Sequence, residues 1–301
     1  MQLSVQMRHL RREYPYYLML IPGVAAILIF HYLPLYGIVI AFEDFDAKDL
    51  FFSRWVGLEN FDYIFQLPGF TRTIWNTLYM AVLKIAGNLI VPVIVALLLN
   101  EVENKRFMKT IQTITYLPHF MSWIILSGVL MDFCSKEGIL NRVIIALGGK
   151  NIYFLGDKTW FPITMVVSDV WKEFGYGTIV YLAALTGIDP NLYEAAAVDG
   201  AMRWKQTIYI TLPGIAPTII LMCTLKLGNI LDAGFEQVFN LYSPIVYETG
   251  DIIDTYVYRL GMEQAQYSAS TAVGLFKSAI AFVLVVLANK MANDLANYQI
   301  F

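Results

Sequence analysis

The sequence predicts an all-α integral membrane protein, and three observations support this fold class. The chain has 301 residues, of which 57% are hydrophobic and only 15% are charged. Its apolar runs reach the roughly 20 residues that a helix needs to cross a bilayer. They are continuous and lack the apolar/polar alternation of outer-membrane barrels. Because lipid offers the backbone no hydrogen-bond partners, we expect helices throughout the membrane.

Six apolar segments occupy most of the chain, and we expect them to form one transmembrane domain, residues 1–301. Arg8, Arg11 and Arg12 precede the first segment, so the positive-inside rule places the N-terminus in the cytoplasm. No small-residue cleavage site follows, so this segment is expected to be retained. Six spans then put both termini in the cytoplasm. The segments are residues 16–41, 73–99, 110–133, 161–186, 208–231 and 271–291.

The connections fit this topology with one exception. The loop after the second segment carries Lys105, Arg106 and Lys109, as a cytoplasmic loop should. Residues 232–268 are acidic and rich in tyrosine, which predicts a long external loop. The expected external stretch 134–160 departs from the charge rule because it contains four basic residues. Within the third segment, Pro118 is expected to bend the helix.

Between segments four and five lies a polar, amphipathic interruption, residues 187–213, on the predicted cytoplasmic side. Asp189 and Pro190 suit the cap and first turn of a short helix over residues 191–199. Three alanines in this helix would let a partner approach closely, and Gly200 permits a sharp turn. Taken by residue type alone, the segment is equally compatible with an ordinary helix-turn-helix connection whose charges face solvent.

This interruption contains Glu194-Ala195-Ala196, then Gly200, Ile210 and Leu212-Pro213, and their spacing resembles the cytoplasmic signature of bacterial ABC importer permeases. That signature reads Glu-Ala-Ala, three residues, Gly, nine residues, Ile, one residue, Leu-Pro. The resemblance implies a fold like that of type I importer permeases and a coupling loop whose first short helix inserts into a groove on an ATPase subunit. The signature positions here are Glu194, Ala195, Ala196, Gly200, Ile210, Leu212 and Pro213, and Asp199 and Arg203 complete the predicted coupling residues.

Four further stretches resemble permeases that import oligosaccharides and polysaccharide fragments. They are residues 30–42, 55–61, 116–123 and 254–278. The resemblance implies that the chain forms half of a pore in the bacterial cytoplasmic (inner) membrane. It also implies a second homologous permease, two ATPase subunits that bind ATP and Mg, and an extracytoplasmic solute-binding protein.

The chain is expected to be non-catalytic and to hold no cofactor. It has no G-x-x-x-x-G-K-[ST] phosphate loop, so ATP should bind only to the partner ATPase. Its three histidines are scattered and its two cysteines far apart, which predicts no metal site. The net charge of -3 and the absence of a basic arm argue against nucleic-acid binding.

Polar residues at membrane depth suggest where a substrate passes, because buried charges there usually face a cavity or each other. In segment four, Asp169, Lys172 and Glu173 share one helical face, so Lys172 can neutralise either carboxylate. A self-satisfied ion cluster and a pore lining are equally compatible with this pattern. If the sugar is acidic, Lys84, Lys172 and Lys226 would offset its charge. The predicted path comprises Lys84, Asn88, Asp169, Lys172, Glu173, Lys226, Asn229 and Asp232.

Two other classes of protein compete with the importer. A secondary transporter would be built from inverted repeats with broken helices, and no repeat between the two halves is evident. A membrane anchor subunit would merely hold partners. An ATPase that is retained on purification in detergent, and stimulated by a liganded binding protein, distinguishes the importer from both.

Overall fold

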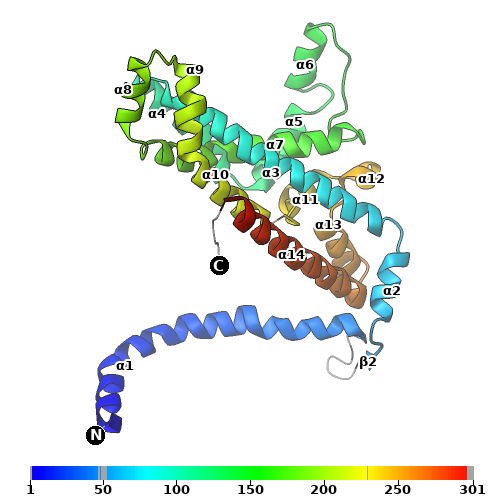
Figure 1. Cartoon of the computed structure of the whole chain (residues 1–301). Coiled ribbons are helices and arrows are strands. Elements are labelled where there is room, and N and C mark those ends of the chain that lie inside the picture. Colours follow the sequence, from blue (N-terminus) through cyan, green and yellow to red (C-terminus); the bar gives the residue numbers. More distant parts are fainter. Residues whose placement is uncertain (1, 47, 49–52, 229, 297–301) are drawn as a thin grey trace. The chain divides into compact units, whose positions relative to one another are not determined.

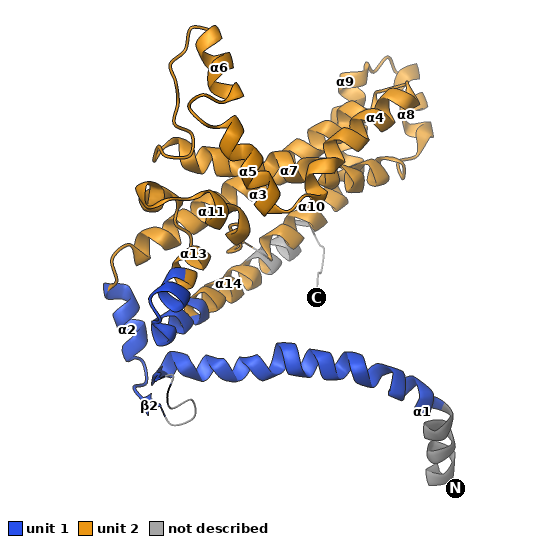
Figure 2. Ribbon diagram, turned by 180° about the vertical axis from the view of Figure 1, so that it is seen from behind, with its two compact units in different colours: residues 1–66, 259–275 blue, residues 67–258, 276–301 orange. Residues whose placement is uncertain are grey.

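The computed structural model describes residues 2–296 except 47, 49–52 and 229. The described chain is almost entirely helical and divides into two compact units (Figure 2). One unit comprises residues 1–66 and 259–275, and the other comprises residues 67–258 and 276–301.

The first unit contains a long apolar helix and a small cap. The helix runs through α1 (Gln2–Ile27), a π-helical turn η1 (Leu28–Tyr32) and a 3-10 helix η2 (Leu33–Phe42). Strands β1 (Glu43–Asp44) and β2 (Arg54–Trp55) pair antiparallel, and α2 (Glu59–Gln66) follows. Asn60 ties these parts together, because its Nδ2 donates to the carbonyls of Ala41 and Glu43. The unit also includes η6 (Arg259–Glu263) and the start of α14 (Tyr267–Ala296).

The second unit contains the long helix α3 (Phe70–Asn100), packed along α7 (Trp160–Leu185) (Figure 1). Small residues allow the helices to approach closely. A Cβ on Gly87 would lie 2.4 Å from the side chain of Val170, and one on Gly175 would lie 2.0 Å from the carbonyl oxygen of Thr115. The remaining elements are α4 (Lys105–Tyr116), η3 (Leu117–Phe120), α5 (Trp123–Phe133), α6 (Ile139–Ala146), α8 (Pro190–Val198), α9 (Arg203–Gln206), η4 (Thr207–Thr211), α10 (Leu212–Leu227), α11 (Phe235–Leu241), η5 (Pro244–Val246), α12 (Tyr247–Gly250), α13 (Ile253–Tyr258) and the rest of α14.

Four described helices are long and apolar enough to cross a membrane: Glu13–Phe42, Phe70–Asn100, Arg203–Leu227 and Tyr267–Leu287. A fifth candidate is the pair Lys105–Phe120 and Trp123–Phe133, which is bent by 107°. This break follows Pro118 closely, where we predicted a bend. The predicted fourth segment coincides with α7, whose 26 residues would extend about 39 Å. Because α7 contains three charged residues, its hydropathy alone does not identify it as a membrane span.

Two apolar clusters of the second unit lie on either side of a polar layer. One joins α3 and α7 to the segment from 233 to 252, with Met80, Phe161 and Val238 fully buried. The other joins α3 and α7 to α10 through Ala96, Tyr181 and Ile215. Between these clusters, Lys84 and Asn88 of α3 contact Asp169 of α7.

The segment from 232 to 268 is not the extended loop that its composition suggested. It forms α11, η5, α12, α13 and η6, and many of its side chains are buried. Asn76 of α3 donates to the carbonyls of Glu248 and Asp251, which fixes part of the segment against α3. At its exposed edge, a hydrogen bond from Lys158 lowers the pKa of Glu248. Each helix here is too short for hydropathy to reveal, and burial by distant elements stabilises it.

Candidate functional site

The predicted coupling residues lie on a compact helix-turn-helix at the end of the second unit, where α4 begins (Figure 1). Asp189 caps α8 by accepting a hydrogen bond from the backbone N–H of Asn191 at 2.9 Å, and Pro190 occupies the first turn. The helix covers Pro190–Val198, one residue earlier at each end than predicted. Glu194, Ala195 and Ala196 lie on it, and Pro213 lies in the first turn of α10.

Asp199 and Gly200 end α8 in a Schellman motif. The N–H of Ala201 bonds to the carbonyl of Ala196 at 2.8 Å, and the N–H of Gly200 bonds to that of Ala197 at 3.0 Å. Gly200 has φ +76°, a left-handed conformation that side chains with a Cβ rarely adopt. The signature glycine therefore occupies the position that turns the chain from α8 into α9.

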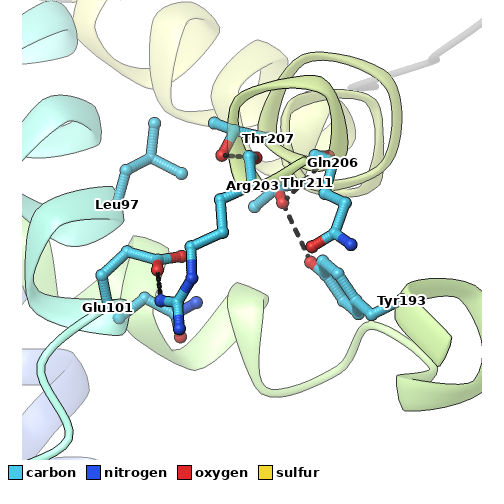
Figure 3. A pocket seen from close by; sticks show the side chains of 8 residues that line it. Leu97, Glu101, Tyr193, Arg203, Gln206, Thr207 and Thr211 are labelled. Carbon is cyan, nitrogen blue, oxygen red and sulfur yellow. Dashed lines mark hydrogen bonds and ion pairs between the residues drawn. The ribbon is translucent and has the colours of Figure 1, made fainter. Parts of the chain in front are cut away.

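Two side-chain contacts orient this helix-turn-helix (Figure 3). Arg203 of α9 forms an ion pair with Glu101, which directly follows α3. The hydroxyl of Tyr193 on α8 lies 3.0 Å from that of Thr211 in η4. These four residues also line a cavity of about 290 Å³. The loop is thus connected to the second predicted span as well as to the fifth.

Reversing the charge of Arg203 should weaken this connection. Both side chains of the pair are largely exposed, so the interaction contributes about 0.2–1 kcal/mol. From the coupling role that the sequence predicts for Arg203, we expect Arg203→Glu to lower substrate uptake per ATP hydrolysed by up to about fivefold. Adding Glu101→Arg should restore most of this loss, as measured by uptake and ATP hydrolysis in membrane vesicles. Failure of the double variant to recover would show that Arg203 acts outside this pair.

Other side chains of the predicted coupling set remain available to a partner. Glu194, Ala195 and Asp199 are exposed, and Glu194 has no ion pair within the described part of the chain. Val198, Met202 and Trp204 add apolar surface, with 89%, 80% and 75% of their areas exposed. Exposed apolar groups around a polar segment are typical of a protein-binding surface.

A second site brings together most of the predicted substrate-path residues. A cavity of about 350 Å³ lies between α3, α7, the end of α10 and the turn before α11. Lys172 does not line it, and Asn229 lies outside the described residues. The six predicted residues that line it are Lys84, Asn88, Asp169, Glu173, Lys226 and Asp232.

Lys84 is a buried residue that lines one side of this cavity. Its Nζ donates to the carbonyl of Ala233 at 2.7 Å and to Gln237, and it lies 3.5 Å from Asp169. Gln237 in turn donates to the Ser168 hydroxyl and the Met165 carbonyl, both at 2.8 Å. The ammonium of Lys84 therefore holds α3, α7 and α11 together.

Lys172 neutralises one of the two carboxylates that share its helical face. It pairs with Glu173 at 3.0 Å, whereas Asp169 pairs with Lys84. Lys172 also donates to the carbonyl of His119 at 3.1 Å, at the break in the third segment. A break in a membrane helix leaves backbone carbonyls without helical partners, and a lysine can satisfy one of them. His119 contacts Glu173 at 2.8 Å and stacks on Tyr176, so the break is fastened to α7.

Sequence reasoning missed Gln237, Ser168 and Glu101. Gln237 lies in the segment interpreted as an external loop, among apolar residues that carry no helical pattern long enough to recognise. Glu101 is 102 positions from Arg203, so no local spacing connects the two. The only feature of the sequence that pointed to this pair is that Glu101, at the end of the second segment, has the opposite charge to Arg203.

The chain matches a known family over most of its length. Residues 14–295 match the family described as binding-protein-dependent transport system inner membrane component. The polygalacturonan/rhamnogalacturonan transport system permease protein YteP of Bacillus subtilis (strain 168) is 43% identical over 287 residues, covering 95% of this chain and 89% of its own length.

Solved structures give the same result. A chain of a bacterial ABC transporter involved in the import of the acidic polysaccharide alginate is 40% identical, with TM-score 0.89 over 97% of this chain and 99% of its own. A second structure of the alginate transporter, in complex with its alginate pentasaccharide-bound periplasmic protein, gives a TM-score of 0.88 at the same identity and coverage. The chain therefore belongs to the family of inner membrane components of binding-protein-dependent transport systems.

Proposed function

We propose that this chain is the permease subunit of an ATP-driven ABC importer for an oligosaccharide or polysaccharide fragment. Its family membership and the carbohydrate names of its relatives support this. The chain itself is non-catalytic, and ATP and Mg bind to its partner ATPase subunits. A second, homologous permease completes the pore, and an extracytoplasmic binding protein delivers the sugar, as the alginate complex suggests by analogy.

In this proposal the chain crosses the bacterial cytoplasmic membrane six times, with both termini in the cytoplasm. The count takes the bent pair Lys105–Phe120 and Trp123–Phe133 as one span and adds α7. The charges of α7 are compatible with a membrane because they meet partners on α3 and at the break after Pro118. Residues 187–213 then form the cytoplasmic coupling loop.

The observation that carries the coupling assignment is the exposed apolar surface on that loop. Val198, Met202 and Trp204 present it around the acidic Glu194. Burying such surface against a partner would be favourable, and the Schellman turn at Gly200 presets its shape. An ATPase groove that receives α8 would cover this surface and transmit motion to α3 and α10.

The test is Glu194→Lys in the assembled importer. We expect the variant to insert and assemble normally but to lose import by about tenfold or more, because a reversed charge at a buried interface opposes binding. Uptake of sugar and ATP hydrolysis are measured together in proteoliposomes. Glu103→Lys is the matched control, since Glu103 is an exposed acidic residue just before α4 and outside the loop.

Normal uptake by Glu194→Lys, with hydrolysis still stimulated by the liganded binding protein, would contradict the coupling assignment. An equal loss in Glu103→Lys would mean that negative charge on this side of the membrane matters in general. Purification without any associated ATPase would favour a gradient-driven transporter or an anchor subunit instead.

A further inference from the structure

Asn88 lines the polar cavity between α3 and α7, and its side-chain oxygen has no donor among the described residues. Asn88 is only 9% exposed, and its Nδ2 donates to Asp169 at 2.8 Å. A carboxylate only accepts hydrogen bonds, so the amide nitrogen must face Asp169, and this fixes the direction of the amide. The Oδ1 of Asn88 is then buried without a hydrogen-bond partner among the described residues. A buried carbonyl oxygen in this position calls for a donor from a ligand or from water.

The same cavity contains a cation with no counter-ion among the described residues. Lys226 lies in the last turn of α10 and lines the cavity, half-buried. No carboxylate of the described residues lies within ion-pair distance of it. The cavity's other lysine is different, because Lys84 is engaged by Asp169, Gln237 and the carbonyl of Ala233. A half-buried ammonium at membrane depth is costly unless an anion or several acceptors approach it.

Of the remaining carboxylates of the cavity, two are paired within the protein and one can still accept hydrogen bonds from a ligand. Asp169 and Glu173 are paired with Lys84 and Lys172, so their charges are neutralised within the protein. Asp232 is exposed and accepts one hydrogen bond, from the backbone N–H of Gly234 at 3.2 Å. It can therefore accept more from a ligand. The open chemistry is thus one cation, Lys226, and two acceptors, the neutral Oδ1 of Asn88 and the negatively charged carboxylate of Asp232.

We propose that this cavity binds an acidic sugar unit on the transport path, with its carboxylate on Lys226 and its hydroxyl groups on Asn88 and Asp232. A uronic-acid ring carries one carboxylate and several hydroxyl donors, which matches one cation and two acceptors. The volume of about 350 Å³ lies within the range of about 300–1,000 Å³ of small-molecule pockets. This inference rests on the proposed function and specifies the substrate class of that same pore.

The test compares an acidic and a neutral sugar in the complete importer with its binding protein and ATPase subunits. The probes are galacturonic acid trisaccharide and the same trisaccharide with its carboxylates reduced to alcohols. Initial uptake rates in proteoliposomes give KM for each probe. Because one binding protein serves all variants, a change in the ratio of the two KM values originates in the permease.

We expect Lys226→Met to raise KM for the acidic trisaccharide by about tenfold or more, as loss of a charge-assisted hydrogen bond predicts. KM for the neutral trisaccharide should change by less than about twofold, since this sugar has no carboxylate that could pair with Lys226. Lys226→Arg should retain the preference for the acidic probe. Lys226→Gln keeps a donor without the charge, so it should behave like Lys226→Met. Lys150→Met, which removes an exposed lysine outside the cavity, should match the wild type.

An unchanged ratio in Lys226→Met and Lys226→Gln, with the wild type importing the acidic probe, would overturn the cavity proposal while leaving the importer intact. Equal weakening of both probes in both variants would also overturn it, because that result assigns Lys226 a structural role. A wild-type importer that takes up the neutral trisaccharide at least as well as the acidic one would likewise overturn the cavity proposal, while the proposed importer function would stand.

Discussion

Replacing Lys84 by methionine is expected to lower the free energy of unfolding by about 3–5 kcal/mol, because it leaves Asp169 as a buried carboxylate without its ion-pair partner. The Lys84 side chain is 6% exposed, and its loss also removes a donor from Gln237 and from the carbonyl of Ala233. Thermal and denaturant unfolding in detergent would measure the change. The polar layer between the two apolar clusters would be the part that loosens.

Two further variants show whether the unpaired charge is the cause. The double variant Lys84→Met/Asp169→Met replaces both charged groups by apolar ones. It should be less destabilised than Lys84→Met alone, since removing one partner of a buried ion pair costs more than replacing both. Lys277→Met breaks an ion pair with Asp254 in which the side chains are 22% and 24% exposed, so its effect should be smaller. If Lys277→Met destabilises the protein as much as Lys84→Met does, burial of the unpaired charge is not the cause of the destabilisation.

Gly200→Val should leave the protein inserted but reduce coupled transport by about fivefold to thirtyfold. The left-handed conformation at Gly200 costs a residue with a Cβ about 1–2 kcal/mol, and a free-energy change of this size corresponds to that range of populations. No heavy atom lies within 4 Å of a Cβ built there, so the effect comes from the backbone and not from a clash. The ratio of sugar imported to ATP hydrolysed is the measurement.

Gly200→Asn is the matched control for this effect. Asparagine adopts the left-handed conformation more readily than other residues with a Cβ, so this variant should keep most of the activity. If asparagine and valine impair coupling equally, the side chain itself blocks the partner, and the turn geometry is not the reason for glycine.

The features that follow from local rules were predictable from the sequence. Four of the six apolar segments coincide with helices long enough to span a membrane, since hydropathy over about 20 residues is a local property. Asp189, Pro190 and Gly200 form the cap, first turn and C-terminal turn that their residue types indicate. The polar residues of the second, fourth and fifth segments were also recognisable, because charge is rare in apolar sequence.

What these polar residues do with one another depends on contacts between distant parts of the chain. Asp169 lies three positions from Lys172 but pairs with Lys84, because the facing helix α3 brings that lysine closer. Gln237, 153 residues from Lys84, completes the wall from a segment whose helices are each too short to recognise. Its conformation is fixed by burial against α3 and α7 and not by its own sequence pattern.

The sequence by itself determined that the chain is a helical membrane protein and that one loop has the spacing of the importer signature, since both depend on hydropathy and spacing within short windows. Only the tertiary structure decided which charges are engaged and which are open. Lys84 and Lys226 are both lysines in apolar segments, yet packing surrounds one with three partners and leaves the other facing a cavity. That difference arises from helices that lie far apart in the sequence, since Lys84 meets partners from Asp169 to Gln237, and it separates a structural lysine from the one proposed to bind substrate.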